Sequence, residues 1–276
     1  MMMRECNKEL EKLLYREKSA KQICAELNNF VDLKSTLLTI LRHIQKLSGS
    51  EAVGIRLEDE GNYPYYVYNG FPDSFIKKEN DLCSKGKHGK RIHEPVTGRY
   101  YLDCWCGRII RGIVIPGLSC FTPGGSLWSN HTSELLSLKT DDDRPIFHRN
   151  FCIFSGYESL ALIPIKAKGD IIGLIQINDK RSGLFTLDFI EFMEMIGEQI
   201  GLAVKNSLIY TKLKNAMDEI TMLETMLPIC SNCKKIRDEK TNTWRHVEEY
   251  FREYRKTDFT HSLCPDCVAL LYPGLA

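Results

Sequence analysis

The residues best suited to chemistry are four cysteines near the C-terminal end of the chain. Cys230 and Cys233 form one C-x2-C pair, Cys264 and Cys267 form a second, and thirty residues separate the two pairs. One tight turn can point both sulfurs of a pair at a single ion, and two pairs supply the four thiolates of a closed tetrahedral zinc site. A small segment can fold around such an ion. The spacing therefore predicts structural zinc, with a redox dithiol as the alternative.

Composition and charge limit the classes of protein to consider. The chain has 276 residues, 43% of them hydrophobic and 26% charged, which suits a packed core with a smaller attached module. The formal net charge of +1 gives no bulk attraction to nucleic acid or to an anionic membrane. The first ten residues lack the apolar core of a signal peptide, and no run of eighteen apolar residues occurs. We expect a cytoplasmic protein without membrane contact, whose eleven cysteines are metal ligands or free thiols.

The helices and strands of the first two hundred residues are predicted from the spacing of their hydrophobic residues. Residues 1–30 predict an amphipathic helix, and a second helix follows from an Asp32 N-cap. Two segments with the composition of β-strands come next, and two further strands are joined by a tight turn at 168–170. The strands are expected at 52–59, 65–70, 159–168 and 170–179. Residues 72–150 are irregular, which is typical of a functional loop or a binding surface.

A long helix is predicted from Thr186 to the residue before Pro228. Its residues in steps of four and three form a heptad seam, which favours a coiled coil with a second copy of the chain over residues 202–227. The seam consists of Leu202, Asn206, Ile209, Leu213, Ala216, Ile220, Leu223 and Leu227. The alternative is a core helix with a wider apolar face.

Several strings resemble a known family. LDCWCGRII, FTPGGSLWSNHTSELL, RNFCIFSGYESLALIPIKAKGDIIGLIQIND and the following GLFT are similar to a C-x-C-G subfamily of GAF domains. This subfamily is found in prokaryotic sensor proteins, often beside PAS domains and histidine kinases. The resemblance covers about residues 30–207. The tail, from LPICSNC to CPDCVALLYP, resembles a short module of similar proteins in which the two C-x2-C pairs look zinc-binding.

The resemblance implies an α+β fold with a GAF-like antiparallel sheet flanked by helices. A long coiled-coil exit helix and a small module like a zinc ribbon or treble clef complete the expected chain. The expected parts are an N-terminal helix at 1–30, the GAF-like domain at 31–207, the coiled coil at 202–227 and the zinc module at 228–276.

The resemblance also implies a second cysteine site inside the GAF-like part. The C-x-C-G turn holds Cys104 and Cys106, and the subfamily carries further cysteines at positions matching Cys83 and Cys152. Four sulfurs would hold a second zinc ion or an iron–sulfur cluster, between which sequence does not decide. Ordinary packing of buried free cysteines is the alternative.

A ligand pocket is predicted around the glycine pair of the FTPGGS string. Glycines let backbone amides approach a ligand, while hydroxyl and amide side chains bind a polar head. The predicted lining is Phe121, Gly124, Gly125, Ser126, Trp128, Asn130, Arg149, Tyr157 and Glu158. The alternative is a simple turn beside a core tryptophan.

Three functions compete. The first is a dimeric sensor that is not an enzyme: its GAF domain binds a small ligand or a metal or redox centre, and its zinc module signals to a protein partner. The second is a thiol-dependent reductase of free methionine sulfoxide, using Cys104, Cys106 and Cys152. The third is nucleic-acid binding through lysines and arginines beside the tail cysteines. Neighbouring acidic residues disfavour the third.

Overall fold

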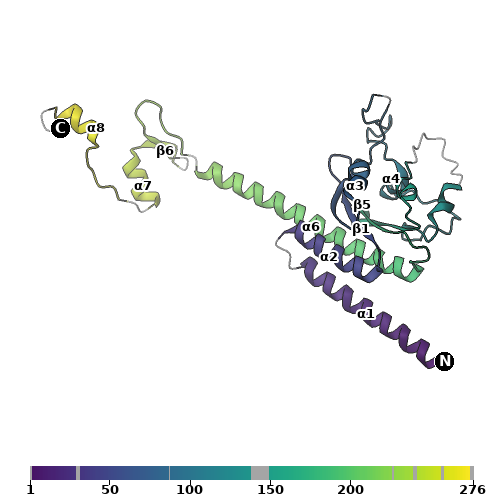
Figure 1. Cartoon of the computed structure of the whole chain (residues 1–276). Coiled ribbons are helices and arrows are strands. Elements are labelled where there is room, and N and C mark those ends of the chain that lie inside the picture. The colour runs from purple at the N-terminus through teal and green to yellow at the C-terminus, as the bar shows by residue number, and fades with distance from the viewer. Residues whose placement is uncertain are drawn as a thin grey trace. The chain divides into compact units, whose positions relative to one another are not determined.

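The computed structural model describes residues 2–28, 32–86, 88–137, 149–225, 227–238, 241–255 and 258–273 (Figure 1). The chain divides into two compact units, Met1–Ile209 and Tyr210–Ala276, and each is described by itself. The boundary falls inside α6 (Leu187–Thr225). Among the described helices, none is both long enough and apolar enough to cross a lipid bilayer.

The first unit is built on a five-stranded antiparallel sheet in the order β2-β1-β5-β4-β3. The strands are β1 (Ala52–Leu57), β2 (Tyr65–Asn69), β3 (Leu127–Ser129), β4 (Ser159–Ala167) and β5 (Asp170–Asp179). The predicted hairpin between the last two is confirmed, because Ala167 pairs with Asp170 across the turn. Lys168 and Gly169 have φ of 54° and 91°, the left-handed conformation that such a two-residue turn needs.

One face of this sheet is covered by α2 (Leu33–Ser48) and the first part of α6, and α1 (Met2–Asn28) packs on α2 (Figure 1). On this face, Ile55 of β1 and Ile175 of β5 pack against buried helix residues such as Ile40 and Ile190. The predicted cap of α2 is confirmed, since the Asp32 carboxylate accepts a hydrogen bond from the Ser35 backbone N–H at 2.8 Å.

The opposite face is covered by the segment that looked irregular in the sequence. It contains α3 (Asp73–Glu79), α4 (Cys104–Ile110), the 3-10 helix η1 (Thr132–Ser137) and α5 (Phe151–Phe154). These helices are short, so they leave no long periodic pattern to read. Arg56 of β1, Leu162 of β4 and Gln176 of β5 face them, and all three are fully buried. The α+β class with an antiparallel sheet flanked by helices is confirmed.

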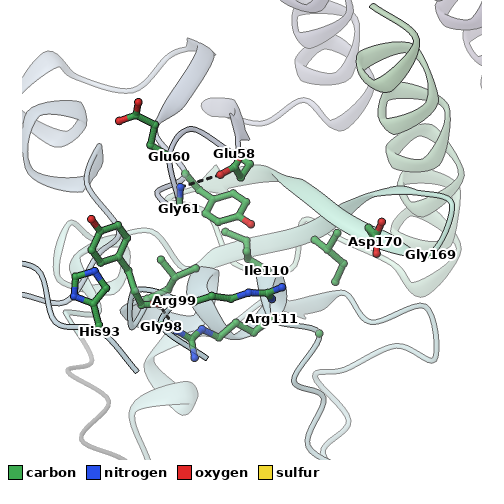
Figure 2. Close-up of a pocket in the computed structure, with 15 residues that line it drawn as sticks. Glu58, Glu60, Gly61, His93, Gly98, Arg99, Ile110, Arg111, Gly169 and Asp170 are labelled. Carbon is green, nitrogen blue, oxygen red and sulfur yellow. Dashed lines mark hydrogen bonds between the residues drawn. The ribbon is translucent and has the colours of Figure 1, made fainter. Parts of the chain in front are cut away.

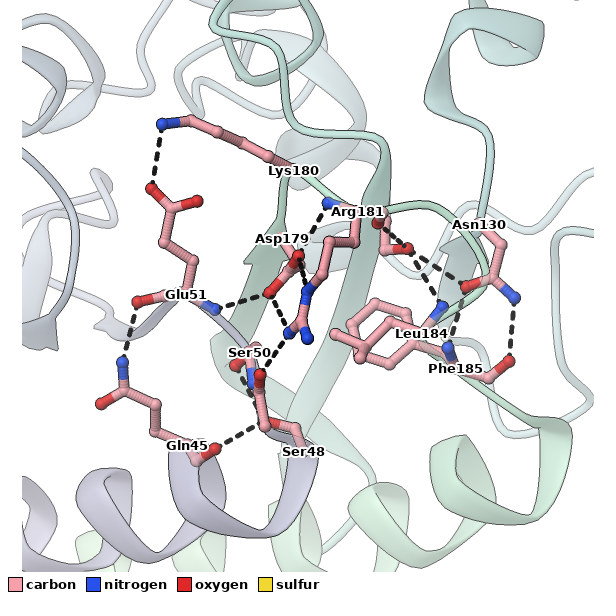
Figure 3. A network of polar contacts seen from close by, with 12 residues as sticks. Gln45, Ser48, Ser50, Glu51, Asn130, Asp179, Lys180, Arg181, Leu184 and Phe185 are labelled. Carbon is pink, nitrogen blue, oxygen red and sulfur yellow. Dashed lines mark hydrogen bonds and ion pairs between the residues drawn. The ribbon is translucent and has the colours of Figure 1, made fainter.

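A polar network fixes the chain that leads into α6 (Figure 3). Arg181 donates to both oxygens of Asp179, at 2.8 Å each, and also to the Gly49 carbonyl at 2.6 Å. The Asn130 side chain bonds the Phe185 backbone in both directions, at 2.8 and 2.9 Å. The start of α6 is thereby tied to α2 and to β3.

The predicted heptad residues on α6 lie at the surface of the chain. Leu202, Ile209, Leu213 and Ile220 are 45%, 54%, 58% and 55% exposed, respectively. The side chain of Leu223 lies outside the described residues, and Leu227 is half-buried. The long helix is confirmed, whereas its pairing with a second copy remains a prediction.

The second unit contains a small hairpin and two helices. Its elements are β6 (Ile236–Asp238), β7 (Thr243–Arg245), α7 (Val247–Arg255) and α8 (Pro265–Leu271). Asp238 is 2% exposed; it accepts a hydrogen bond from the Tyr254 hydroxyl at 2.7 Å and lies 3.5 Å from the Arg245 guanidinium. These contacts join α7 to the hairpin, whereas α8 buries none of its residues.

Candidate functional site

Three of the four cysteines predicted for the GAF site share one buried region. Cys104 and Cys106 lie on α4, Cys152 lies on α5, and each is at most 5% exposed. Gln176 of β5 connects two of them: its Nε2 donates to Cys152 Sγ at 3.3 Å, and its Oε1 accepts from Cys106 Sγ at 3.8 Å. Cys104 Sγ accepts from the Asn150 backbone N–H at 3.3 Å.

A buried cation accompanies these thiols. Arg56 is fully buried, donates to the carbonyls of Tyr63 and Glu79 at 2.9 Å each, and lies 3.6 Å from the Tyr65 ring centre. The Tyr65 hydroxyl donates to Gln176 Oε1 at 2.8 Å. Gly54 makes room for this ring, because an added Cβ would lie 2.7 Å from it. Arg56 is thus held in place by contacts that do not use the thiols.

Acidic and basic groups border the same region. Glu79 is 1% exposed, and its Oε1 lies 3.9 Å from Arg149 NH1. Arg149 Nε also lies 3.4 Å from Asp103 Oδ2. The second oxygen of Glu79 accepts no hydrogen bond from any described residue. A buried carboxylate oxygen without a donor is costly, which is typical of a site that another group completes.

Burial keeps the three thiols protonated. It raises the pKa of Cys104, raises that of Cys106 to about 12, and raises that of Cys152 well above the ordinary value. The Arg56 guanidinium acts in the opposite direction on Cys106 and Cys152, because it favours the thiolate. The site therefore holds neutral thiols beside a cation that can compensate for their charge if they ionise.

Backbone strain marks the first thiol. Cys104 has φ of 67°, in the left-handed region that costs a non-glycine residue free energy and often marks a functional position. Gly107 explains the glycine of the C-x-C-G turn: an added Cβ would lie 2.6 Å from Leu102 Cβ and 2.7 Å from its carbonyl oxygen. Close packing of α4 on Leu102 thus fixes where Cys104 and Cys106 lie.

The fourth predicted ligand, Cys83, has different neighbours. Its thiol lies 3.6 Å from Asn62 Oδ1, and burial raises its pKa to about 11. It lines a separate hollow of 280 Å³, together with Asp103, Arg149 and three lysines. Its bonding partners are not shared with the other three cysteines.

Several residues predicted for a ligand pocket are engaged within the fold. Asn130 bonds the Phe185 backbone, and the Ser126 backbone N–H donates to Glu194 Oε1 at 3.3 Å. The Gly124 carbonyl accepts from Lys166, and a Cβ on Gly124 would meet the Glu194 carboxylate. The FTPGGS loop is therefore packed onto β4 and α6.

The remaining predicted pocket residues are spread over different surroundings. Tyr157 is 2% exposed in an aromatic cluster, and Glu158 bonds Asp179 and Thr132 through its backbone. Phe121 packs beside Trp105. Trp128 and Asn130 line a hollow of 270 Å³ near η1, and the buried indole N–H of Trp128 finds no acceptor among the described residues.

A larger hollow lies among residues for which sequence analysis predicted no site (Figure 2). Its volume is about 810 Å³. Four separate segments line it: the turn between β1 and β2, residues 93–102, the end of α4 and the turn between β4 and β5. The only hint in the sequence was the irregular character of residues 72–150.

The tail cysteines form two local pairs. The backbone N–H groups of Cys233 and Asn232 donate to Cys230 Sγ and lower the Cys230 pKa. The backbone N–H of Cys267 does the same for Cys264. Amide donors around a sulfur favour its thiolate, the form that binds metal. Across the described ranges, no three His, Cys, Asp or Glu side chains are close enough to share an ion, so joining of the pairs remains a prediction.

Comparison with known proteins identifies the first unit. The family model of the GAF domain matches residues 32–204, well over half of the chain, so the chain belongs to the GAF domain family. No curated protein matches the chain in sequence.

Solved GAF structures resemble the chain at low identity. The GAF domain of a phosphoenolpyruvate-protein phosphotransferase from Coxiella burnetii is 14% identical, with a TM-score of 0.49, over 71% of this chain and 96% of that one. The free methionine-R-sulfoxide reductase of Neisseria meningitidis is 15% identical, with a TM-score of 0.47, over 72% and 93%. The A. aeolicus NlH2 GAF domain is 14% identical, with a TM-score of 0.46, over 71% and 99%. At these scores the likenesses do not distinguish a sensor from an enzyme.

Proposed function

We propose that this GAF protein is a sensor whose stimulus acts on the cluster formed by Cys104, Cys106 and Cys152. The cluster binds a small ligand or holds a metal or redox centre, and α6 carries the change to the tail module, which contacts a protein partner. The observation that supports this most directly is the convergence of thiols from α4 and α5 on Gln176. The strings around them also favour membership of the C-x-C-G subfamily.

No three described Cys, His, Asp or Glu side chains form a group that could hold an ion as they stand, so a thiolate-bound centre would have to draw the thiols together. Zinc ions and iron–sulfur clusters are bound by cysteine thiolates. Net charge that remains in a buried site is costly unless an opposite charge lies nearby. Arg56 lies fully buried beside the thiols and provides that counter-charge. When bound, the metal would supply the charge that ionises the thiols, while Arg56 and Gln176 orient and balance them.

The same features weigh against a thiol-dependent reductase. A nucleophilic cysteine needs an accessible sulfur with a lowered pKa. Here the three sulfurs are at most 5% exposed and burial raises the pKa of each. A protonated, buried thiol is a slow nucleophile.

Metal analysis and an absorption spectrum of full-length protein purified without oxygen test the sensing centre. We expect two metal centres per chain, and expect Cys106→Ser to remove the one in the GAF unit. Cys120→Ser is the matched control, because Cys120 is half-buried in the same unit but outside the cluster. Metal confined to the tail in the unaltered protein would contradict a metal centre. If Cys106→Ser then responded to oxidants and ligands as the unaltered protein does, sensing by the cluster would be contradicted altogether.

The tail is proposed to hold zinc through Cys230, Cys233, Cys264 and Cys267. In each pair, backbone N–H groups donate to a sulfur and so favour its thiolate. The helix α8 buries none of its residues. A shared ion would bring the two pairs together and stabilise a unit with little core of its own.

Substitution of Cys233 by serine in the full chain tests this site. We expect the loss of one zinc ion and faster proteolysis of the tail, with the GAF unit unaffected. Cys24→Ser, in α1, is the control. If Cys233→Ser retained the zinc content and protease resistance of the unaltered protein, the four-cysteine site would be wrong.

We propose that α6 pairs with its counterpart in a second copy of the chain. The heptad residues Leu213 and Ile220 are more than half exposed, and a seam of this period is typical of a two-stranded coiled coil. The double variant Leu213→Ser, Ile220→Ser should sediment as a monomer. The control Leu208→Ser, Met217→Ser removes equally exposed side chains that lie off the seam and should leave the dimer intact. A dimer that persists in the first variant would rule out this interface.

A further inference from the structure

We propose that the 810 Å³ hollow beside the end of α4 binds a small organic anion, a monocarboxylate or a phosphate monoester, between Arg99 and Arg111. The volume lies within the range of about 300–1,000 Å³ that small-molecule sites occupy. Figure 2 shows both arginine side chains extending into the middle of the hollow from different segments. This site does not depend on the proposed thiol centre.

Arg111 is held in place from three sides. Its NH2 donates to the Tyr100 carbonyl, its NH1 lies 3.7 Å from Glu94 Oε1, and its guanidinium carbon is 5.5 Å from the Tyr101 ring centre. The side chain is 21% exposed. A guanidinium fixed in this way loses little side-chain entropy when an anion binds to its remaining N–H groups.

Arg99 lacks such contacts. It is exposed, and its guanidinium makes no hydrogen bond or ion pair with any residue that the structure describes. Both arginines lie close enough to Tyr63 to lower its pKa, although burial and Glu58 raise that pKa overall. Two guanidinium groups and a phenol hydroxyl therefore face a common space. An oxyanion there would accept charge-assisted hydrogen bonds from both guanidinium groups.

The rest of the lining narrows the class of ligand. The carboxylates of Glu58, Glu60 and Asp170 line the same hollow, so a highly charged polyanion would be repelled. Glu58 Oε1 already accepts the Gly61 backbone N–H at 2.8 Å. The rings of His93 and Tyr100, with centres 4.4 Å apart and tilted by 38° to each other, add an aromatic wall. These features fit a small anion that also carries hydroxyl or other donor groups.

The hollow also has a structural connection to the thiol cluster. α4 runs from Cys104 in that cluster to Ile110, which lines the hollow, and Arg111 is its C-cap. A bound anion that fixes Arg111 would therefore stabilise the end of the same short helix. The two sites can be tested separately because their side chains do not overlap.

Calorimetric titration of the full-length protein with glycerol 2-phosphate, inorganic phosphate and pyruvate tests the proposal. We expect saturable binding of at least one probe, weakened about tenfold or more by Arg99→Gln, as loss of a charge-assisted hydrogen bond implies. The Arg99 guanidinium bonds to no residue within the described part of the chain, so this variant should fold normally; Arg111→Gln should weaken binding as well. Arg42→Gln, which removes an exposed arginine from α2, is the matched control and should bind as the unaltered protein does.

The relative affinities of the three probes identify the class of ligand. Tighter binding of glycerol 2-phosphate assigns the site to phosphate esters, and tighter binding of pyruvate assigns it to carboxylates. The absence of saturable binding of all three probes up to ~10 mM, a weak affinity even for a small ligand, would overturn the proposal. So would unchanged affinity in Arg99→Gln, or an equal loss in Arg42→Gln.

Discussion

The GAF unit and the tail place cysteines in opposite environments. In the GAF unit, Cys106 and Cys152 are almost completely buried, and burial raises the pKa of each. In the tail, Cys264 is exposed, and the backbone N–H of Cys267 lowers its pKa. The same side chain is thus a neutral core group in one unit and a thiolate precursor in the other. What distinguishes them is desolvation in one case and local amide donors in the other.

The two units also differ in what holds the cysteines in position. Sheet pairing, helix packing and the network around Asp179 fix the GAF unit through contacts within the chain. The tail fixes each C-x2-C pair only within its own turn, and α8 buries nothing. Packing therefore determines the first arrangement, whereas the second would depend on an ion.

Thiol labelling gives the largest contrast. In metal-free protein at pH 8, Cys230 and Cys264 should react with iodoacetamide about a thousandfold faster than Cys106. The pKa of Cys106, about 12, leaves only ~10⁻⁴ of it as thiolate, and burial also blocks access. Peptide mass spectrometry would measure each rate.

The denatured protein is the control for that experiment, because all its cysteines should label at similar rates. Restored zinc should protect the tail thiols. Equal labelling of the two sets in the native, metal-free protein would show that the contrast between the units is false.

A smaller effect concerns the packing that positions the core thiols. Gly107→Ala should destabilise the GAF unit by about 1–3 kcal/mol, because the new Cβ meets Leu102 at 2.6 Å. Helix propensity alone would predict the opposite sign, since alanine is favoured over glycine within a helix. Chemical denaturation measures the difference. Gly86→Ala is the matched control, since its nearest atoms would lie 3.8 Å away.

If Gly107→Ala matched Gly86→Ala in stability, close packing would not be what places Cys104 and Cys106. In the expected case, the variant should also label faster at these two cysteines, because looser packing exposes them.

The smallest effect lies in the polar network at the start of α6. The hydrogen bond from Arg181 holds the Asp179 pKa below its usual range. A carboxylate with a lowered native pKa stabilises the fold above its unfolded pKa, near 4, and loses that contribution as the pH falls through its native pKa. Asp179→Asn should therefore cost about 1 kcal/mol at pH 7 and flatten the loss of stability below pH 4.

Urea unfolding at several pH values would measure this. Asp170→Asn, at the other end of β5, is the control, because that carboxylate is 79% exposed. An acid response of Asp179→Asn that equals that of the unaltered protein would mean that the network contributes no pH-dependent stability.

Sequence reasoning succeeded where a signal is local. Asp32 caps its helix, Lys168 and Gly169 make their turn, and β4 and β5 form the predicted hairpin. The same reasoning assigned Asn130 and Gly124 to a ligand, whereas the fold engages both in internal contacts. Polar and glycine-rich loops can serve either purpose, and only their neighbours decide which.

The large hollow escaped prediction for a related reason. Arg99 and Arg111 come from different segments and meet Glu58 and Asp170 only after the sheet and α4 are assembled. None of these residues stands in a recognisable spacing with the others. A site made of long-range contacts leaves no pattern in the linear order of residues.

The sequence alone determined the α+β class, the main helices and strands, the GAF resemblance and the paired spacing of the tail cysteines. These depend on interactions within a few residues or on the periods of a strand and a helix, about 2 and about 3.6 residues. Only the tertiary structure decided that Cys106 and Cys152 meet at Gln176 near a buried Arg56, while Cys104 contacts Asn150 and Cys83 contacts Asn62. The pKa of each thiol follows from desolvation and nearby charge, and both are set by residues distant in the chain.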